Sequence, residues 1–538
     1  MSDYPMLISN KLHSFRNFIL QTYIKSANNS MPNSNFIRID LSLQPITTQK
    51  VMRKAILIAL TAVIMGSAPS DIYAGNVNRT EKSQKAGKSH SEKKTGWGFG
   101  ILPCLTFSSD MGFQYGVFGD LYNYGDGSTY PNYRDKISYE ASHFTKGRTR
   151  LFLSYDSRVL IPKVRSSVSI TYIDDPLYSF WGFNGAATPV FNSLISNKSY
   201  ASQISDGTIP AADAAFFGSM GVDPLKKVSY YYTDRDIIRV LADFQGNITE
   251  HLQWAGGLSY WNFRMKDINE KKYGYDASST LYHHYKQFGV IKESEAKGGS
   301  RLEIKAGLVY DSRDFETAPN KGIWAEFYVN GSPDVFGDGF NYLKLNAHFR
   351  HYVSIPFGFK VGDPVFAYHL AYQGSLAGET PFYMQQNISA LVLKQMMSEG
   401  LGSSNTIRGT HANRLIGDGY LWGNFELRIK FVDFRLLKQN FYIAANPFFD
   451  CGMIVQPYRV REMSALPEIQ ALAVAAGHKP ENAQKYIRNM ASQFISTGGF
   501  GLKLAWNQNF IASAEIAHNF NKGIGDPFWI SLGTNYCF

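Results

Sequence analysis

Residues 421–431 read LWGNFELRIKF, and this stretch decides the fold. Apolar residues fall on every second position from Leu421 to Phe431, with Gly423 among them, while polar and charged residues occupy nearly all the positions between. A period of two is typical of a β-strand with one apolar and one polar face. The same split recurs in RLEIKAGLVYD at 301–311 and in YLKLNAHFRHY at 342–352.

Two architectures bury such apolar faces. A soluble sandwich packs them against each other, and a transmembrane barrel turns them towards lipid. The barrel also accounts for strands of about 10–12 residues, for aromatic residues at strand ends and for an export signal. The composition also fits a barrel, because the chain is 15% aromatic and only 18% charged, whereas a typical soluble protein has about 25% charged residues. We therefore predict an all-β, transmembrane antiparallel barrel.

The alternating segments predict sixteen strands. We place them near 97–107, 112–122, 134–146, 148–158, 164–174, 229–246, 251–266, 301–311, 322–330, 341–354, 363–374, 419–432, 440–454, 495–506, 510–520 and 527–538. The long connections 175–228, 267–300, 375–418 and 455–494 all follow odd-numbered strands. If the first strand leaves the periplasm, these connections are extracellular and the short turns are periplasmic.

The region before the barrel, which we place at 96–538, has three predicted parts. Residues 52–74 combine a basic start, the apolar stretch Ala55–Met65 and a small-residue cleavage site, and we interpret them as a signal peptide. Residues 1–51 then form an upstream extension from a start codon set too early, with a genuine cytoplasmic leader as the alternative. Residues 75–95 form a basic, disordered tail.

Charge and motifs exclude several function classes. Residues 1–74 hold seven basic and three acidic side chains, and 75–95 hold six and two, which leaves +2 of the net +10 for the barrel. The high pI is therefore no argument for nucleic-acid binding. The longest apolar stretch, Ala55–Met65, is too short to span a bilayer as a helix, which excludes a helical membrane protein. No catalytic motif occurs, the three cysteines match no zinc pattern, and we predict no enzyme activity, cofactor or metal site.

The last third of the chain resembles the bacterial surface antigen superfamily of outer-membrane assembly factors, which includes the insertase of the barrel-assembly machinery. The resemblance rests on an ordered set of motifs. These are Tyr310–Asp314, similar to Tyr-Asp-Thr-Arg-Asn; Ile407-Arg408-Gly409-Thr410, similar to Val-Arg-Gly-Phe/Tyr; Gly423–Arg428, similar to Asn-x-Glu-Leu-Arg; Phe448–Gly452, similar to Phe-x-Asp-x-Gly; and a Gly-rich hairpin from Gly498 leading into a C-terminal Phe.

The motif residues themselves suggest a contact inside the barrel. Strand parity directs Glu426 and Asp450 into the lumen from adjacent strands, and a folded-back loop would place the Arg408 guanidinium between them. Gly409 would permit the tight bend at the loop tip. In the alternative, Arg408 is solvated and the acids pair with Arg428, Lys430 or Lys503 along the wall. Thr410 departs from the family, which usually has an aromatic residue there.

The resemblance implies a role in outer-membrane protein insertion, translocation or assembly. The implied partners are outer-membrane lipids, unfolded client proteins, a periplasmic partner and the assembly machinery that inserts this barrel itself, with Tyr536 and Phe538 as its C-terminal insertion signal on the outer face. Because 75–95 cannot form a client-capture module, we expect a barrel-only member in the bacterial outer membrane.

Client insertion in such a barrel would use the contact between its first and last strands. Candidates for weakening that contact are Gly98, Gly100, Pro103, Gly525 and Gly533, since Gly loosens a strand and Pro lacks an N–H donor. In the alternative, the glycines reflect ordinary packing in the barrel wall. The alternative function is a passive channel or surface receptor.

Overall fold

A computed structural model describes residues 95–538, except 129–132, 184–198, 208–213, 215–222, 224, 229, 288, 316–317, 360, 392–395, 437–438, 459–470, 472–493, 507–509, 522–527 and 535. The chain divides into two units, 1–67 and 68–538, and every described residue belongs to the second. The predicted upstream extension, the signal peptide and all but the last residue of the basic tail lie outside the described residues.

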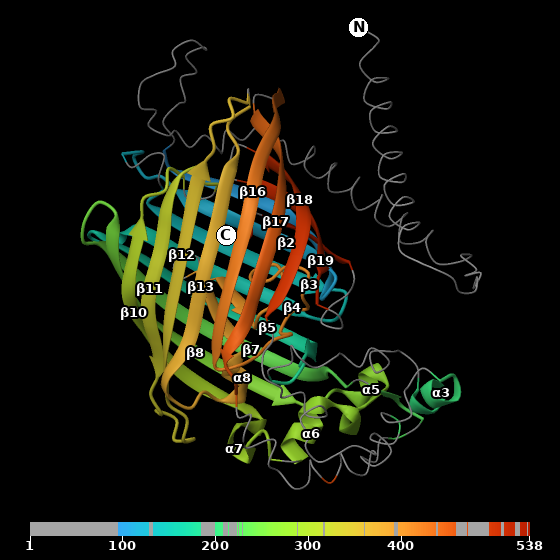
Figure 1. Cartoon of the computed structure of the whole chain (residues 1–538). Helices are drawn as coiled ribbons and strands as arrows, with labels where there is room; N and C mark the ends of the chain where they lie inside the picture. The colour runs from blue at the N-terminus through green and yellow to red at the C-terminus, as the bar shows by residue number, and fades with distance from the viewer. Residues whose placement is uncertain are drawn as a thin grey trace, which may run out of the picture. The chain divides into compact units, whose positions relative to one another are not determined.

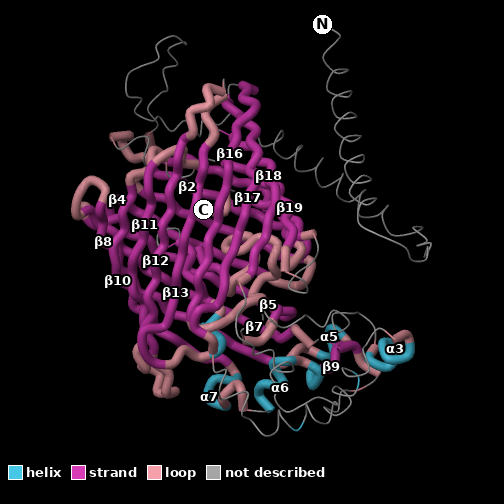
Figure 2. The backbone as a smooth tube through the Cα atoms, viewed as in Figure 1, coloured by secondary structure: helices cyan, strands magenta, loops and turns pink. Residues whose placement is uncertain are grey.

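Sixteen antiparallel strands close into one barrel (Figures 1 and 2), which confirms the predicted fold class. In order around the barrel they are β1 (Trp97–Ser108), β2 (Gly112–Asn123), β3 (Asp135–Phe144), β4 (Thr149–Ile161), β5 (Val164–Ser179), β7 (Tyr232–Asn247), β8 (Leu252–Lys266), β10 (Gly298–Asp311), β11 (Gly322–Ser332), β12 (Tyr342–Ser354), β13 (Val365–Gly378), β16 (Gly419–Leu436), β17 (Gln439–Gln456), β18 (Ile495–Trp506), β19 (Phe510–Asn519) and β20 (Trp529–Thr534).

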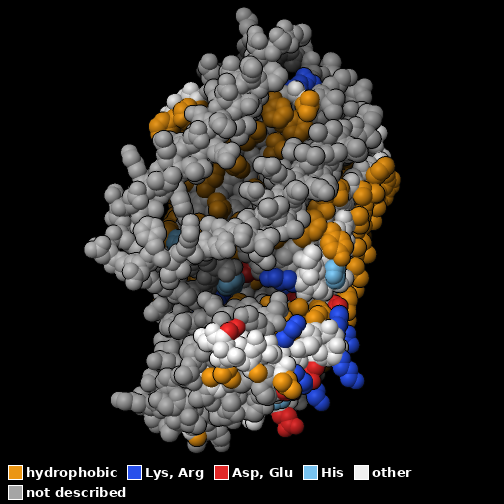
Figure 3. All heavy atoms as spheres, turned by 90° about the vertical axis from the view of Figure 1, so that its right-hand side faces the viewer, with side chains coloured by type: hydrophobic (Ala, Val, Ile, Leu, Met, Phe, Trp, Pro, Cys, Tyr) orange, Lys and Arg blue, Asp and Glu red, His pale blue; other side chains and the backbone are white. Residues whose placement is uncertain are grey.

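The two faces of each strand meet different surroundings, as the period of two predicts. In β16, Trp422, Glu426 and Arg428 are buried on the lumen side, whereas Leu421 and Phe431 are exposed on the outer side. Large apolar side chains are exposed along the outside of most other strands too, and Figure 3 shows hydrophobic side chains along the barrel wall. A closed barrel pairs its strand backbones internally, so this apolar outer wall suits hydrocarbon.

The long connections all lie at one end of the barrel, which we call the loop end, and the other is the turn end. They join β5 to β7, β8 to β10, β13 to β16 and β17 to β18, and the helices gather beside them at the bottom of Figure 1. The helices are α3 (Tyr200–Ser205), α5 (Glu270–Tyr273), the 3₁₀ helix η3 (Ala277–Ser279), α6 (Leu281–Gln287), α7 (Glu293–Ala296) and α8 (Phe382–Gln385).

These connections also form two small sheets, which the alternation pattern did not predict. One pairs β14 (Asn387–Leu391) with β15 (Met396–Glu399), and the other pairs β6 (Lys227–Val228) with β9 (Tyr275–Asp276). None of the helices in the described ranges is long and apolar enough to cross a membrane.

The four long connections share an aromatic core, which we call the loop cap. Phe180, from the first of them, lies 6.5 Å from Tyr282 of the second and 6.2 Å from Phe382 of the third, measured between ring centroids. Phe183 lies 4.5 Å from Tyr458 of the fourth. All five rings are fully buried or nearly so. The connections therefore fold together over the loop end.

The loop cap contains a titratable group in α6. His284 is buried there, and burial lowers its pKa from 6.5 to about 3. The folded state thus holds this proton more weakly than the unfolded state, so the free energy of unfolding of the cap falls as the pH drops below about 6.5 towards 3. We expect amide hydrogen exchange in 281–291, corrected for its intrinsic pH dependence, to accelerate from pH 7 to pH 4.

The variant His284→Phe tests this assignment, because it keeps an aromatic ring in α6 and removes the titration. Its exchange rate in 281–291 is expected to change little over the same pH range. His283→Phe is the matched control, since His283 is the neighbouring histidine, lies 3.6 Å from Asp267 and is more than a third exposed. Equal pH dependence in His284→Phe and in the unmodified protein would contradict the assignment.

The end of the chain corrects one prediction. Phe528 and Ile530 do lie on the outer face, but β20 ends at Thr534 and the last residues turn inwards. Tyr536 lies against Arg428, and Phe538 lies 5.6 Å from the ring of His369. Both contacts are with lumen side chains, so Tyr536 and Phe538 do not continue the outer apolar row. The aromatic rings instead find cationic and aromatic partners inside the barrel.

Candidate functional site

The connection between β15 and β16 carries the motif Ile407–Thr410 and lies inside the barrel. We call it the motif loop. Its approach is fixed by Thr406, whose hydroxyl donates to the carbonyl oxygen of Gly402 at 2.7 Å and accepts from the Gly402 N–H at 2.9 Å. Asn424 of β16 donates to the carbonyl oxygen of Thr406. Ile407, Arg408 and Thr410 are fully buried. The loop tip is therefore a built part of the lumen.

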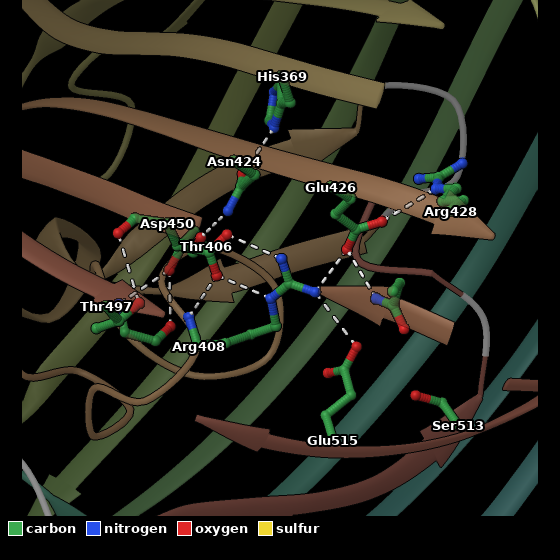
Figure 4. A network of polar contacts seen from close by, with 12 residues as sticks. His369, Thr406, Arg408, Asn424, Glu426, Arg428, Asp450, Thr497, Ser513 and Glu515 are labelled. Atoms are coloured by element: carbon green, nitrogen blue, oxygen red, sulfur yellow. Dashed lines mark hydrogen bonds and ion pairs between the residues drawn. The ribbon is translucent and has the colours of Figure 1, made fainter. Parts of the chain in front are cut away.

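Arg408 makes a forked contact with Asp450 (Figure 4). Its Nε and Nη2 donate to the two carboxylate oxygens of Asp450, each at 2.8 Å, and its backbone N–H adds a third bond at 3.0 Å. Nη1 donates to Glu426 at 2.5 Å. The structure thus brings Arg408 together with both acidic residues that strand parity directed to the lumen. Two parallel charge-assisted bonds give orientation as well as energy.

Further charges complete the network. Glu515 of β19 lies 3.2 Å from Arg408 Nη1 and 2.6 Å from Lys503 Nζ, and Arg428 donates to Glu426 at 3.0 Å. The cluster of Arg408, Arg428, Lys503, Glu426, Asp450 and Glu515 holds three cations and three anions. A desolvated cluster is stable only if its charges are paired, and here the signs balance.

The motif Phe448–Gly452 lies on β17 and faces the tip of the motif loop. Phe448, Asp450 and Gly452 are two residues apart and share the lumen face, so each meets a different part of the loop tip. The Phe448 ring lies 3.6 Å from the Arg408 guanidinium. At Gly452, a Cβ would lie 2.8 Å from the Ile407 side chain. The same Cβ would lie 2.8 Å from the backbone carbonyl oxygen of Leu421 on β16, so both the docked loop and the neighbouring strand favour glycine there.

Thr410 replaces the usual aromatic residue with a polar contact. Asn519 of β19 donates to the Thr410 hydroxyl at 2.9 Å, and the Thr410 carbonyl accepts from the Ser403 N–H at 2.9 Å. The loop tip is held on this side by hydrogen bonds to a strand that sequence reasoning did not connect with it.

Gly409 adopts a φ of +86°, which disfavours side chains, and a Cβ there would lie 3.0 Å from that of Ala517. We expect Gly409→Ala to lower the free energy of unfolding by about 1–3 kcal/mol through backbone strain and crowding. Urea unfolding in detergent measures this. Gly337→Ala is the control, since its φ of +72° carries similar strain in open space. Equal losses of stability in the two variants would mean that crowding against Ala517 contributes nothing at Gly409.

The sequence left two alternatives: Arg408 docks between Glu426 and Asp450, or these acids pair with cations along the wall. The structure contains parts of both. Glu426 bonds Arg408 and also Arg428, as the alternative proposed for the wall. Lys503 pairs with Glu515, while Lys430 bonds Asn320 at 3.1 Å. Glu515 was missed because its strand carries no charged motif. Only its lumen parity could have identified it.

Other polar clusters are weaker candidates for ligand binding. The carboxylates of Asp174, Asp234 and Asp236 lie within 4.8 Å of one another, but Lys266 pairs with Asp236 at 2.8 Å. His348 and His369 are buried wall residues whose ring nitrogens approach to 3.1 Å. We assign no metal to either cluster.

The contact between β1 and β20, which we call the seam, is the shortest in the barrel. Among the described residues, the ladder pairs only Phe107 with Leu532 and Ser108 with Ser531, and the Ser109 N–H adds one backbone hydrogen bond to the Ile530 carbonyl at 3.1 Å. Every other neighbouring pair of barrel strands spans at least six residue pairs. The ladder with β1 stops at Leu532, before β20 itself ends at Thr534, and the last residues of the chain then turn inwards.

The motif loop also reaches the seam. His411 lies 2.9 Å from Asp110 in the turn between β1 and β2, and Trp529 at the start of β20 donates to the same carboxylate at 3.3 Å. Asp110 thus connects the motif loop with both seam strands at the loop end of the barrel.

The chain resembles a known protein family and, more distantly, several solved structures. The Omp85 superfamily domain matches residues 211–527, a span that includes the motif loop and the strands facing it. No curated protein matches the chain. BamA from Haemophilus ducreyi lacking POTRA domains 1–3 is 13% identical, with a TM-score of 0.45 over 89% of this chain and 78% of that chain. CdiB from Escherichia coli is 10% identical, with a TM-score of 0.45 over 81% of this chain and 62% of that chain. The domain match confirms the predicted resemblance, and the chain belongs to the Omp85 superfamily.

Proposed function

We propose that this protein is a bacterial outer-membrane barrel that assists the insertion or translocation of other polypeptides at its seam. The observation that carries the proposal is the short seam: in the described part of the chain, β1 and β20 share two residue pairs and one further backbone hydrogen bond, from Ser109 to Ile530. The role is not enzymatic. Its partners would be outer-membrane lipids, unfolded client chains and a periplasmic protein that delivers them, with the loop end facing outwards.

The exposed edge of β1 supplies the driving force. Among the described residues, no strand pairs with β1 from Trp97 to Thr106 on the seam side. Trp97, Phe99 and Ile101 are more than half exposed on the outer face, which suits lipid. Each backbone group left unpaired in hydrocarbon costs several kcal/mol, so a client strand that pairs with this edge is stabilised.

Local sequence keeps this edge weak. Pro103 removes one N–H donor, and Gly98 and Gly100 reduce side-chain packing in the part of β1 that has no described partner on the seam side. Gly533 lies in β20, and Gly525 lies outside the described residues. A strand of this kind exchanges partners at lower cost than a regular one.

A disulfide across the seam tests the proposal. In a variant with the three native cysteines replaced by alanine, Ser108→Cys and Ser531→Cys would join the paired residues of β1 and β20. We expect oxidation to slow insertion of a urea-unfolded eight-stranded outer-membrane barrel into proteoliposomes at least tenfold, and reduction to restore it, because the seam must part.

The matched control is Ser138→Cys with Ser154→Cys, two serines paired across β3 and β4 within a continuous ladder. This disulfide is expected to leave insertion unchanged. Full insertion activity with a completely oxidised seam would rule out client passage at β1 and β20.

A further inference from the structure

The hairpin of β16 and β17 carries a second free strand edge, at the turn end. β13 pairs with β16 only between Tyr420 and Arg428, whereas β17 continues to pair with it as far as Leu436. No strand in the described part of the chain takes up the outer edge of 429–436. The hairpin projects from the barrel at the top of Figure 1, and residues 431–436 are all exposed.

The two faces of this projecting hairpin differ. The rings of Phe434 and Phe441 stack at 5.3 Å with an interplanar angle of 9°, and Val432 lies opposite Ile443 on the same, outer face. Leu436 continues that row and is 51% exposed. Asp433 and Arg435 occupy the alternate positions. The free edge therefore has the alternating chemistry of a strand that lacks its neighbour.

The adjoining turn adds apolar surface. Ser354 pairs with Val365, and Val365 pairs with Arg428, so the turn between β12 and β13 lies beside the start of the free edge. Phe357 and Phe359 in this turn stack at 5.9 Å and are 66% and 51% exposed.

Neither lipid nor water alone suits such an edge. Hydrocarbon would cover the phenylalanine and leucine side chains but leave the backbone N–H and C=O groups unpaired. Water would satisfy the backbone but leave the apolar row exposed, and such edges are prone to bind other strands. An extended polypeptide satisfies both, because its backbone pairs with the edge and its alternate side chains pack on the row.

We propose that the edge 429–436 binds an extended segment of another polypeptide by strand addition, with alternating apolar side chains against Val432, Phe434 and Leu436. The site lies on the far side of β17, β18, β19 and β20 from the seam. Binding here does not require the seam to open, so this inference stands or falls separately from the proposed function.

Fluorescence quenching tests it on the full chain. A bimane label at Leu436→Cys, with the native cysteines replaced by alanine, reports on a synthetic peptide of alternating valine and threonine that ends in tryptophan. We expect saturable quenching. Two further peptides have the same sequence but carry N-methyl groups at every second residue, one peptide along each edge of the strand. They are expected to bind at least tenfold more weakly, because they cannot complete the hydrogen-bond ladder.

Two variants locate the binding. Val432→Lys with Phe434→Lys is expected to weaken binding at least tenfold, while Asp433→Ser, on the opposite face, leaves it unchanged; an intact heat-modifiable band checks the fold of each. Equal quenching by the N-methylated peptides would overturn the proposal without any variant. Quenching of the Leu436 label by brominated lipid in nanodiscs, with none by the peptide, would show that the bilayer covers the hairpin and would also overturn it.

Discussion

Replacing Arg408 with alanine is expected to convert a mostly closed barrel into a conducting one and to destabilise it by about 3–5 kcal/mol, as for other buried ion pairs that lose one partner. The guanidinium holds Asp450 by a fork and Glu426 by a short bond. Without it, two buried carboxylates lose their main cation and repel each other. The loop then leaves the lumen wall, and water replaces it.

Single-channel recording in planar bilayers measures the first effect, and urea unfolding measures the second. Arg408→Lys keeps the charge but not the fork, so we expect an intermediate conductance and a smaller loss of stability. Arg435→Ala, at an exposed arginine of the β16 hairpin, is the control and is expected to change neither. A large, steady conductance before any substitution would instead favour the passive channel.

The strand pattern could be predicted because the barrel enforces it locally. Successive residues of β12 or β16 face the outside and the lumen in turn, so their polarity alternates with a period of two. The positions of the long connections follow from strand count alone. The Arg408 contact could be predicted for a related reason, since Glu426 and Asp450 are held at fixed parity on neighbouring strands.

The remaining features depend on contacts that no local pattern records. The loop cap is assembled from connections far apart in sequence, such as Phe183 with Tyr458. Glu515 enters the network through strand order around the barrel, which brings β19 opposite the motif loop. The inward turn of the last residues is a long-range effect of the same kind, because the alternation of Phe528 and Ile530 continues smoothly into Tyr536 and Phe538.

Arg428 holds the end of the chain in the lumen, and its removal is expected to release it. Nη2 donates to the Phe538 carbonyl at 2.7 Å, and the guanidinium lies 4.1 Å from the Tyr536 ring and 5.2 Å from the Phe538 ring. Cation–π contacts of this kind contribute about 0.5–2 kcal/mol each. The same arginine bonds Glu426, the partner of Arg408, so it connects the chain end with the motif loop.

Once released, the last residues can extend β20 along the free edge of β1. Continuing the register of Phe107 with Leu532 places Leu102 opposite Cys537. In a Leu102→Cys variant that retains Cys537 and lacks the other two cysteines, we expect a disulfide to form at least tenfold faster when Arg428→Ala is added. Lys430→Ala is the control, since Lys430 is the next lumen cation of β16 and bonds Asn320 instead.

A longer seam would also be harder to open. We therefore expect Arg428→Ala to slow client insertion even before any disulfide forms, because each added residue pair must be broken when the strands part. If the disulfide forms equally fast with Arg428 in place, the chain end already samples the seam and the lumen contacts do not restrain it. If Arg428→Ala leaves both rates unchanged, the inward turn is set by Tyr536 and its other neighbours, such as Lys503, whose Nζ lies 5.2 Å from the ring.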